Sequence, residues 1–233
     1  MRFVFHLLYH PFAFTYDLVA ATVSLGRWKD WVLSVVPLIE GNRILEIGHG
    51  PGHLQRALLT LRHGSGRDRN LLAIGIDESA PMGRLAKHNL RRALNSEPHS
   101  VTITPQSAYA QINLTRAVAQ HLPFSNDSFD TVVATFPSEY IFASETLTEA
   151  NRVLSPNGRF VILPGATLIG RRLLDRMMAL LFRITGQTAP NVAEMLRERT
   201  KKPFAEAGFH VQNHELELQS SLVFIIVATK ISC

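Results

Sequence analysis

The stretch of sequence most suggestive of chemistry is ILEIGHGPG, residues 44–52. It places one carboxylate, Glu46, among aliphatic residues and then has glycine at every second position, Gly48, Gly50 and Gly52. Glycines let a backbone come close to a ligand, and free amides at the start of a following helix offer hydrogen-bond donors. A strand, a glycine loop and a helix start in this order predict a nucleotide-sized binding site.

The spacing of the glycines argues against two common nucleotide sites. The dinucleotide fingerprint G-x-G-x-x-G needs its third glycine where this chain has His53, because Gly52 comes one position early. The sequence also lacks G-x-x-x-x-G-K-[ST], the phosphate loop of many ATPases and GTPases. An NAD-dependent oxidoreductase is therefore disfavoured.

Two carboxylates could select the ligand. A buried, unpaired carboxylate is costly, so Glu46 should meet a cationic ligand group, directly or through water, or else only cap local amides. Asp77 directly follows the apolar run LLAIGI at 71–76, and a carboxylate there can accept hydrogen bonds from ribose hydroxyls. Asp77 could instead serve only as the N-cap of the next helix, and the two roles can coexist.

The elements that must position these residues alternate along the chain. Runs rich in aliphatic or β-branched residues predict buried strands at 43–47, 71–76, 131–136 and 159–165. Helical patterns lie between them, at 52–62, 79–94 and 143–154, and the last is followed by the turn SPNG at 155–158. This alternation predicts an α/β fold, a Rossmann-like parallel sheet with helices on both faces.

Two parts of the chain depart from plain alternation. A further strand is expected either near 101–105 or near 114–119. At the C-terminal end, a helix around 192–207 precedes two apolar runs, 208–218 and 220–230. These two runs are joined too tightly for a parallel crossover, so they predict an antiparallel hairpin that ends the sheet.

Composition limits the class of protein. A chain of 233 residues and 26.0 kDa is suited to one domain with a substantial core. Its single cysteine, Cys233, excludes an internal disulfide framework and fits a reducing compartment. The N-terminal residues 1–26 contain His6, His10 and Pro11 within their apolar run, so we interpret them as mature protein, neither a signal peptide nor a membrane span. A cytoplasmic location is expected.

The distribution of charged residues along the sequence indicates which kinds of partner the protein could bind. The formal net charge is +5, and basic residues gather in 62–92 and 168–202 without interleaved aromatic residues, so nucleic acid is not expected as a partner. The segment 168–184 forms a basic amphipathic pattern with a methionine-rich apolar side. Such a helix can lie on an anionic membrane surface as a peripheral contact, or pack on its own domain as a lid. Both alternatives favour a small apolar substrate.

Four segments together carry a resemblance to a known family: EIGHGPG (46–52), IDESAPM (76–82), AQHLPFSNDSFDTVVATF (119–136) and EANRVLSPNGRFVIL (149–163). In their order and spacing they resemble class I S-adenosylmethionine-dependent methyltransferases. The similar group is the small-molecule one (methyltransferase type 11) that includes ubiquinone- and menaquinone-biosynthesis enzymes. The resemblance covers about 43–165 and implies a seven-stranded, mostly parallel sheet with a reversed last strand. It also implies S-adenosyl-L-methionine as cofactor and S-adenosyl-L-homocysteine as product.

The resemblance implies where the methionine and ribose parts of this cofactor lie. The methionine part lies against the glycine loop 48–52, with Glu46 beneath it, and Asp77 binds the ribose hydroxyls. Thr135 and Phe136 follow the fourth strand near the methionine end.

The adenine is expected between two further pairs of residues. Glu78 and Met82 lie near one side of it, and Ala119 and Gln120 border the other. Members of the family often carry an aspartate that contacts the adenine amino group, at the position where this chain has Val118. Either another group makes that hydrogen bond here, or packing holds the base.

Methyl transfer itself requires few reactive side chains. The protein has to align donor and acceptor and keep water out, and neither a nucleophile nor a metal is needed. A general base is required only if the acceptor must lose a proton. The candidates for acid-base work are His10, Tyr16, Glu139 and Tyr140, each of which also has a plain structural interpretation, and His49 receives no catalytic role.

The sequence thus predicts one methyltransferase domain with a helical cap (1–40), a cofactor-binding core (43–165), an amphipathic lid segment (166–202) and a C-terminal hairpin (203–233). We expect methyl transfer to an oxygen, nitrogen or carbon atom of a small lipophilic acceptor. One alternative is a phospholipid-type N-methyltransferase at the membrane surface. Another is a non-catalytic cofactor-binding or scaffold protein, since a fold does not guarantee an activity. The oligomeric state is left open.

Overall fold

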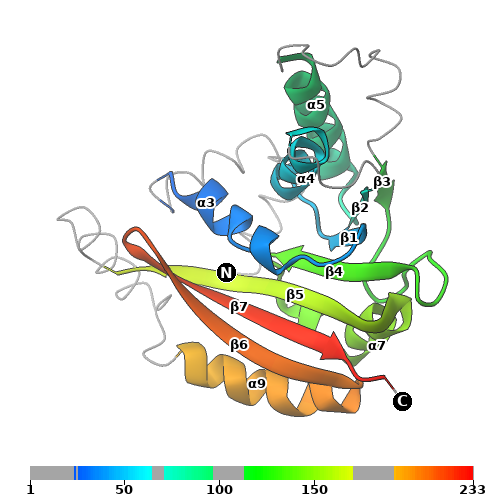
Figure 1. The fold of residues 1–233 in the computed structure, drawn as a ribbon, viewed down its shortest axis with the longest axis vertical. Helices are drawn as coiled ribbons and strands as arrows, with labels where there is room; N and C mark the ends of the chain where they lie inside the picture. The colour runs from blue at the N-terminus through cyan, green and yellow to red at the C-terminus, as the bar shows by residue number, and fades with distance from the viewer. Residues whose placement is uncertain (1–23, 25, 65–70, 97–112, 170–191, 233) are drawn as a thin grey trace.

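The computed structural model describes residue 24 and residues 26–64, 71–96, 113–169 and 192–232 (Figure 1). Several predicted features lie outside these residues. They are the alternative strand near 101–105, the candidates His10 and Tyr16, and nearly all of the amphipathic segment 168–184. The division of the chain into cap, core, lid and hairpin stays a prediction.

Seven strands form one sheet in the described part of the chain. They are β1 (Arg43–Ile47), β2 (Leu72–Asp77), β3 (Asn113–Arg116), β4 (Phe129–Thr135), β5 (Leu154–Leu168), β6 (Phe209–Leu218) and β7 (Ser221–Lys230). The strand order is β3-β2-β1-β4-β5-β7-β6. Strands β1 to β5 pair in parallel, whereas β7 runs antiparallel to both β5 and β6. The predicted sheet and its antiparallel C-terminal hairpin are confirmed.

Helices cover both faces of the sheet, as predicted. Figure 1 shows α3 (Trp28–Leu33), α4 (His53–Gly64) and α5 (Ala80–Ser96) on one side, and α7 (Ser144–Val153) and α9 (Val192–Glu206) on the other. Two short 3₁₀ helices, η2 (Val36–Leu38) and η3 (Glu139–Phe142), follow α3 and β4. None of the described helices is both long and apolar enough to span a membrane.

The two faces carry separate hydrophobic cores, and β1 contributes to both because side chains alternate along a strand. Ile44 packs with α3 and α4, through residues such as Trp31 and Leu58. Leu45, its neighbour, packs on the opposite side with Leu147 of α7. Burial of β1 on both faces explains why its sequence is almost continuously apolar. It also makes the carboxylate of Glu46 in the same strand conspicuous.

Two predicted details can be compared with the strands. Of the two alternative positions for a further strand, 114–119 overlaps β3. The turn SPNG lies within the span of β5: Leu154 pairs with Phe129 and Arg159 with Thr131, so the four residues between them bulge out of the ladder. Asn157 in this bulge has a φ of 61°. A proline, which lacks an amide hydrogen, and a left-handed asparagine are suited to a bulge but not to regular pairing.

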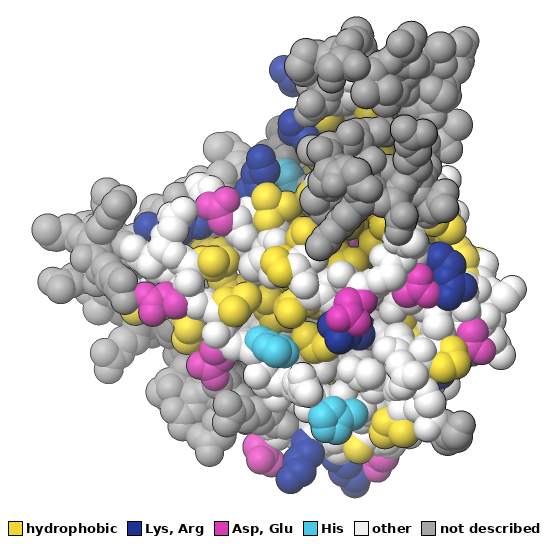
Figure 2. Space-filling model, in the orientation of Figure 1, with side chains coloured by type: hydrophobic (Ala, Val, Ile, Leu, Met, Phe, Trp, Pro, Cys, Tyr) yellow, Lys and Arg dark blue, Asp and Glu magenta, His cyan; other side chains and the backbone are white. Residues whose placement is uncertain are grey.

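Charged side chains of both signs are interspersed on the face shown in Figure 2, as far as the described residues reach. Elsewhere in the structure, on α9, the ammonium nitrogen of Lys202 lies 3.8 Å from a carboxylate oxygen of Glu206.

Asp130, near the start of β4, joins the amino ends of two strands. Its Oδ2 accepts hydrogen bonds from the backbone amides of Asn42 and Arg43, both at 3.0 Å. Its Oδ1 accepts from the Arg43 guanidinium and from the Ser155 hydroxyl. Partial burial raises the pKa of Asp130, but the hydrogen bonds from Arg43 and Asn42 outweigh it and lower the pKa to about 2.

We predict that Asp130→Ala destabilises the protein by about 2–3 kcal/mol at neutral pH, because two backbone amides and a guanidinium lose a charged acceptor. The folded-state pKa lies below the unfolded value of 3.8, so this stabilisation is present above pH 3.8 and disappears as the pH falls towards about 2. Urea unfolding of both proteins across this range should therefore give curves that converge in acid. A constant difference would contradict the role assigned to the ionised carboxylate.

Candidate functional site

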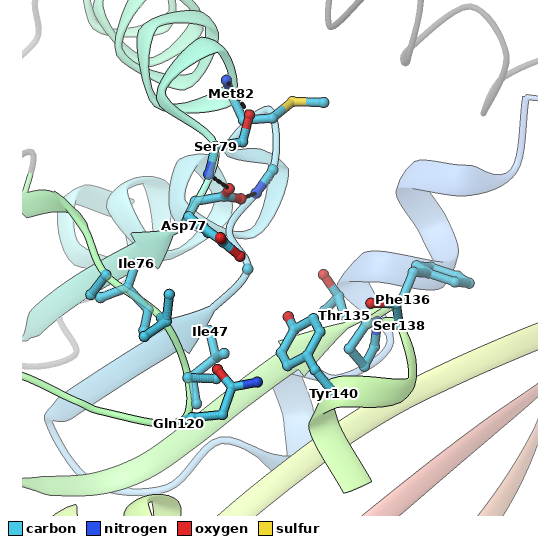
Figure 3. Close-up of a pocket in the computed structure, with 17 residues that line it drawn as sticks. Ile47, Ile76, Asp77, Ser79, Met82, Gln120, Thr135, Phe136, Ser138 and Tyr140 are labelled. Atoms are coloured by element: carbon cyan, nitrogen blue, oxygen red, sulfur yellow. Dashed lines mark hydrogen bonds between the residues drawn. The ribbon is translucent and has the colours of Figure 1, made fainter. Parts of the chain in front are cut away.

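A pocket of about 420 Å³ lies where the carboxyl ends of β1, β2, β3 and β4 meet (Figure 3). Parallel strands bring their carboxyl ends to one edge of a sheet, which is where open α/β sheets bind ligands. The lining residues come from four chain segments: Ile47, Gly48 and Gly50; Ile76, Asp77, Glu78, Ser79 and Met82; Ala117, Val118, Ala119 and Gln120; Thr135, Phe136, Pro137, Ser138 and Tyr140.

The glycine loop between β1 and α4 is held by backbone groups of its neighbours. The amides of Gly48 and His49 both donate to the carbonyl of Ile76, at 2.8 and 3.1 Å. The Asn89 side chain of α5 donates to the carbonyl of Pro51 at 3.1 Å. Within the loop, the Gly52 amide donates to the His49 carbonyl at 3.0 Å. The end of β2 and helix α5 together fix the course of this loop.

Asp77 links the loop to the start of α5. Its two carboxylate oxygens accept from the amide of Gly50 at 2.9 Å and from that of Ser79 at 2.8 Å (Figure 3). The Ser79 hydroxyl in turn accepts from the Met82 amide at 3.4 Å, which makes Ser79 the cap of α5. Asp77 thus has a local structural role. Because a carboxylate can accept about four hydrogen bonds, it retains capacity for ligand hydroxyls.

The three glycines of the loop have different surroundings. All have positive φ, 71° at Gly48, 51° at Gly50 and 88° at Gly52. A Cβ on Gly50 would meet no atom within 4 Å, whereas one on Gly52 would lie 3.3 Å from the Cβ of Ala86 on α5. A Cβ on Gly48 would lie 2.7 Å from the hydroxyl oxygen of Tyr140. Gly50 therefore exposes bare backbone to the pocket, and Gly52 allows close packing of the loop on α5.

Glu46 lies beneath the loop, away from the pocket. Its position in β1 directs it to the same face as Ile44, and its Oε2 accepts a hydrogen bond from the Gln55 side chain of α4 at 3.0 Å. The residue is only 1% exposed. Burial raises the pKa of this carboxyl group to about 8, although the Gln55 bond opposes the shift. Glu46 is therefore protonated in the folded protein at neutral pH.

The far end of the pocket is aromatic. Phe136 stacks on Trp28 of α3, with ring centroids 3.9 Å apart and planes inclined by 25°. Trp31 adds a tilted contact at 6.2 Å. Phe136 has a φ of 49°, which is unfavourable for a residue with a Cβ and persists only where surrounding contacts impose it. Tyr140 of η3 completes this end, with its hydroxyl close to Gly48.

The opposite end of the pocket is formed by the segment after β3. Val118, at the position where the family resemblance leads one to expect an aspartate, is 39% exposed and lines the pocket. Its carbonyl accepts from the His121 amide at 3.3 Å in a tight turn. This end therefore offers apolar surface and the side-chain amide of Gln120, without a carboxylate at position 118.

Most of the predicted cofactor-binding residues line this one pocket: Gly48, Gly50, Asp77, Glu78, Met82, Ala119, Gln120, Thr135 and Phe136. Glu46 and Gly52 do not line it. Of the acid-base candidates, Tyr140 lines the pocket, Glu139 does not, and His10 and Tyr16 lie outside the described residues. Val118, at the position that the family resemblance places beside the adenine, also lines the pocket. Additional lining residues that sequence reasoning had not assigned to the site are Ile47, Ile76, Ser79, Ala117, Pro137 and Ser138.

Some of these additional residues could have been found from the sequence. Ile47 and Ile76 are the last apolar residues before the glycine loop and before Asp77, so they necessarily border the carboxyl edge of the sheet. Pro137 and Ser138 depend on how the chain leaves β4, which no sequence motif defined. Within the described ranges, no group of three or more His, Cys, Asp or Glu side chains is arranged to bind a metal.

The fold and pocket agree with comparisons with known proteins. The methyltransferase domain family matches residues 45–162, just over half of the chain. The chain therefore belongs to this family, and it is a class I S-adenosylmethionine-dependent methyltransferase.

Individual relatives refine this picture. The chain is 29% identical to the demethylmenaquinone methyltransferase of Lactiplantibacillus plantarum over 67% of its own length and 60% of that protein. It is 26% identical to the ubiquinone/menaquinone biosynthesis C-methyltransferase UbiE of Pseudomonas paraeruginosa, over 87% and 79% of the two chains. A crystal structure from Methanococcus maripaludis, described as an S-adenosyl-L-methionine-dependent methyltransferase, superposes with a TM-score of 0.63. That match has 17% identity and covers 95% and 93% of the chains.

The residues present fit S-adenosylmethionine, the cofactor of this family. The space that a Cβ on Gly50 would occupy is open, so a ligand can reach the backbone there. The carboxylate of Asp77 accepts a hydrogen bond from the amide of the same residue. Val118, which lines the pocket and is 39% exposed, offers apolar surface for a flat base. These residues would hold the cofactor, which supplies a methyl group on a positively charged sulfur.

Two glycine substitutions test this arrangement as a matched pair. In Gly50→Ala the new Cβ enters open pocket space at a φ of 51°, so we predict at least a tenfold loss of affinity for S-adenosylhomocysteine and a destabilisation of about 1–2 kcal/mol. In Gly52→Ala the Cβ crowds Ala86 at a φ of 88°. We therefore predict a larger loss of stability and a smaller loss of affinity than in Gly50→Ala. Calorimetric titration and thermal unfolding measure both quantities. The reverse ranking would remove Gly50 from the binding surface.

Glu46→Gln tests the buried carboxyl group. The folded-state pKa of Glu46, about 8, exceeds the unfolded value of 4.5. The contribution of the protonated carboxyl group to the free energy of unfolding is therefore fully present below pH 4.5, and it is lost as the pH rises through about 8. A glutamine cannot ionise, so the variant should gain stability relative to the wild type over this range, by at most about 1.4 kcal/mol per pH unit. Urea unfolding at several pH values measures the difference. A difference independent of pH would show that Glu46 is already ionised in the fold.

Proposed function

We propose that this protein transfers a methyl group from S-adenosylmethionine to a ring carbon of a small, apolar, quinol-type acceptor. The observation that carries the proposal is the aromatic end of the pocket, where Phe136 is stacked on Trp28 beside Tyr140. The two similar proteins, a demethylmenaquinone methyltransferase and a quinone-biosynthesis C-methyltransferase, support it. The chain spans about 60% of the first of these, so the activity of the whole protein belongs to the proposal.

An aromatic acceptor suits this end of the pocket for physical reasons. Flat rings gain both apolar burial and favourable stacking geometry against aromatic side chains. The phenol of Tyr140 lies at the junction between the glycine loop and the aromatic end, since a Cβ on Gly48 would touch its oxygen. From there it could donate a hydrogen bond to an oxygen substituent of the acceptor ring. Apolar walls on either side would exclude water from the reacting atoms.

Carbon methylation requires an electron-rich ring, and this restricts the form of the acceptor. The reduced quinol is nucleophilic at carbon, particularly after one hydroxyl loses its proton, whereas the oxidised quinone is electrophilic. The methyl group replaces one ring hydrogen, which leaves as a proton. A phenol hydroxyl can donate a hydrogen bond to an oxygen, so we assign Tyr140 the role of orienting the acceptor. His10 and Tyr16 remain candidates for a general base.

The alternatives receive less support. Membership of a methyltransferase family and similarity to quinone methyltransferases favour neither a scaffold protein nor a phospholipid N-methyltransferase. Peripheral contact with an anionic membrane remains a prediction, because residues 170–191, which include most of the basic amphipathic segment, lie outside the described part of the chain.

The test is a methylation assay with three acceptors: a short-chain demethyl-naphthoquinol kept reduced by a chemical reductant, its oxidised quinone assayed without reductant, and phosphatidylethanolamine in vesicles. We expect S-adenosylhomocysteine formation with the quinol alone, and mass spectrometry should locate the new methyl group on a ring carbon. Methylation of the phospholipid instead, or of a quinol oxygen, would overturn the proposal.

A matched variant tests the aromatic end. Tyr140→Phe keeps the ring and removes the hydroxyl, so the quinol reaction should slow about tenfold while affinity for S-adenosylhomocysteine changes less than twofold. Equal losses of rate and of cofactor affinity would instead place Tyr140 in the cofactor site alone.

A further inference from the structure

His49 occupies the second position of the glycine loop, where sequence reasoning gave it no task. Its ring is almost completely buried, with 4% of the residue exposed. The space for the ring exists because β2 has a glycine beneath it: a Cβ on Gly75 would lie 3.1 Å from the Cδ2 of His49 and 3.2 Å from its Cβ. A histidine enclosed in this way has its position fixed by packing.

The ring makes one short polar contact, to its own loop. Nδ1 of His49 lies 2.8 Å from the carbonyl oxygen of Gly50. A carbonyl oxygen can only accept, so Nδ1 must carry the hydrogen in this contact. Burial lowers the pKa of His49, and Lys87 acts in the same direction, while Asp77 and the contact with Gly50 oppose the shift. At neutral pH the ring is therefore uncharged, with its hydrogen on Nδ1.

Gly50 is consequently held on both sides of its backbone. Its amide donates to Asp77 at 2.9 Å, and its carbonyl accepts from His49 at 2.8 Å. This is the residue with bare backbone facing the pocket and a φ of 51°. A glycine in such a loop has many accessible conformations, so fixing it requires groups from outside its own side chain.

We propose that His49 is a positioning residue for the cofactor: its Nδ1–H holds the Gly50 carbonyl while Asp77 holds the Gly50 amide, so the loop keeps the shape that lets the cofactor approach. The role is indirect, since His49 itself does not line the pocket. This role depends only on binding of S-adenosylmethionine or its product, and not on the acceptor proposed above. The role of His49 would be the same if this protein methylated a different acceptor.

Two substitutions separate the hydrogen bond from packing. In His49→Asn the side-chain amide nitrogen can take the place of Nδ1 and donate to Gly50, but the side chain is smaller and leaves space over Gly75. In His49→Leu the side chain fills more of that space but has no donor. We expect His49→Leu to bind S-adenosylhomocysteine about threefold to tenfold more weakly than the wild type, as the loss of one neutral hydrogen bond implies. His49→Asn should stay within about twofold of the wild type.

Affinity from calorimetric titration is compared with thermal unfolding of the ligand-free proteins. A purely structural role predicts the opposite order, because the better-filled leucine variant would then match or exceed the asparagine variant in both measurements. Asparagine binding as weakly as leucine, or leucine binding as tightly as the wild type, would overturn the proposal.

A third measurement uses the wild-type protein and does not depend on the variants folding. Nitrogen-15 spectra of the imidazole at about pH 7.5 show which ring nitrogen carries the hydrogen. We expect Nδ1–H for His49, whereas neutral histidine in water favours Nε2–H. An Nε2–H signal would remove the contact on which the proposal depends.

Discussion

A ligand can approach the loop 48–52 only because Gly48 and Gly50 lack side chains, and a glycine has no side chain of its own with which to fix its backbone. The positive φ angles of the loop are accessible to glycine but are not imposed by it. The conformation must come from other groups, and the structure provides them: the carbonyl of Ile76, the carboxylate of Asp77, the side-chain amide of Asn89 and, within the loop itself, the ring of His49. The first two belong to β2, whose parallel register with β1 pairs Ile47 with Ile76. The shape of the pocket therefore depends on the pairing of two central strands.

The same edge of the sheet carries unfavourable features that other contacts offset. Glu46 is buried in the central strand and stays uncharged, with Gln55 as its hydrogen-bond partner. Phe136 adopts a left-handed backbone conformation, and its stacking on Trp28 helps to hold it there. Strain of this kind costs on the order of 1–3 kcal/mol and tends to gather at functional sites. Phe136 lines the pocket and Glu46 lies beneath its glycine loop, whereas the described amino ends of the strands, around Asp130, are joined by hydrogen bonds to a charged acceptor.

The sequence predicted those parts of the molecule that local pattern determines. Strand and helix positions followed from hydrophobic periodicity, and Asp77 with the glycines followed from their place after β1 and β2.

The partners of these residues could not be predicted in the same way. Gln55 reaches Glu46 across nine positions, and Asn89 reaches Pro51 across 38, so each pairing exists only once the helices have docked on the sheet. The slot for His49 likewise required Gly75 and the loop to be neighbours in space. The SPNG bulge shows a further limit, because turn residues indicate a break in pairing but not whether the strand has already begun.

The two ends of the sheet therefore differ in what their charged groups do. At the amino ends Asp130 accepts from Arg43 and from two backbone amides, and its strong acidity keeps it ionised over most of the pH range. At the carboxyl ends Asp77 accepts from two amides as well, but both belong to residues that line the pocket. A ligand hydroxyl bound to Asp77 would add to these bonds without breaking them, because the carboxylate has further lone pairs. The loop can thus be organised before the cofactor arrives, so little ordering cost has to be met from the binding free energy.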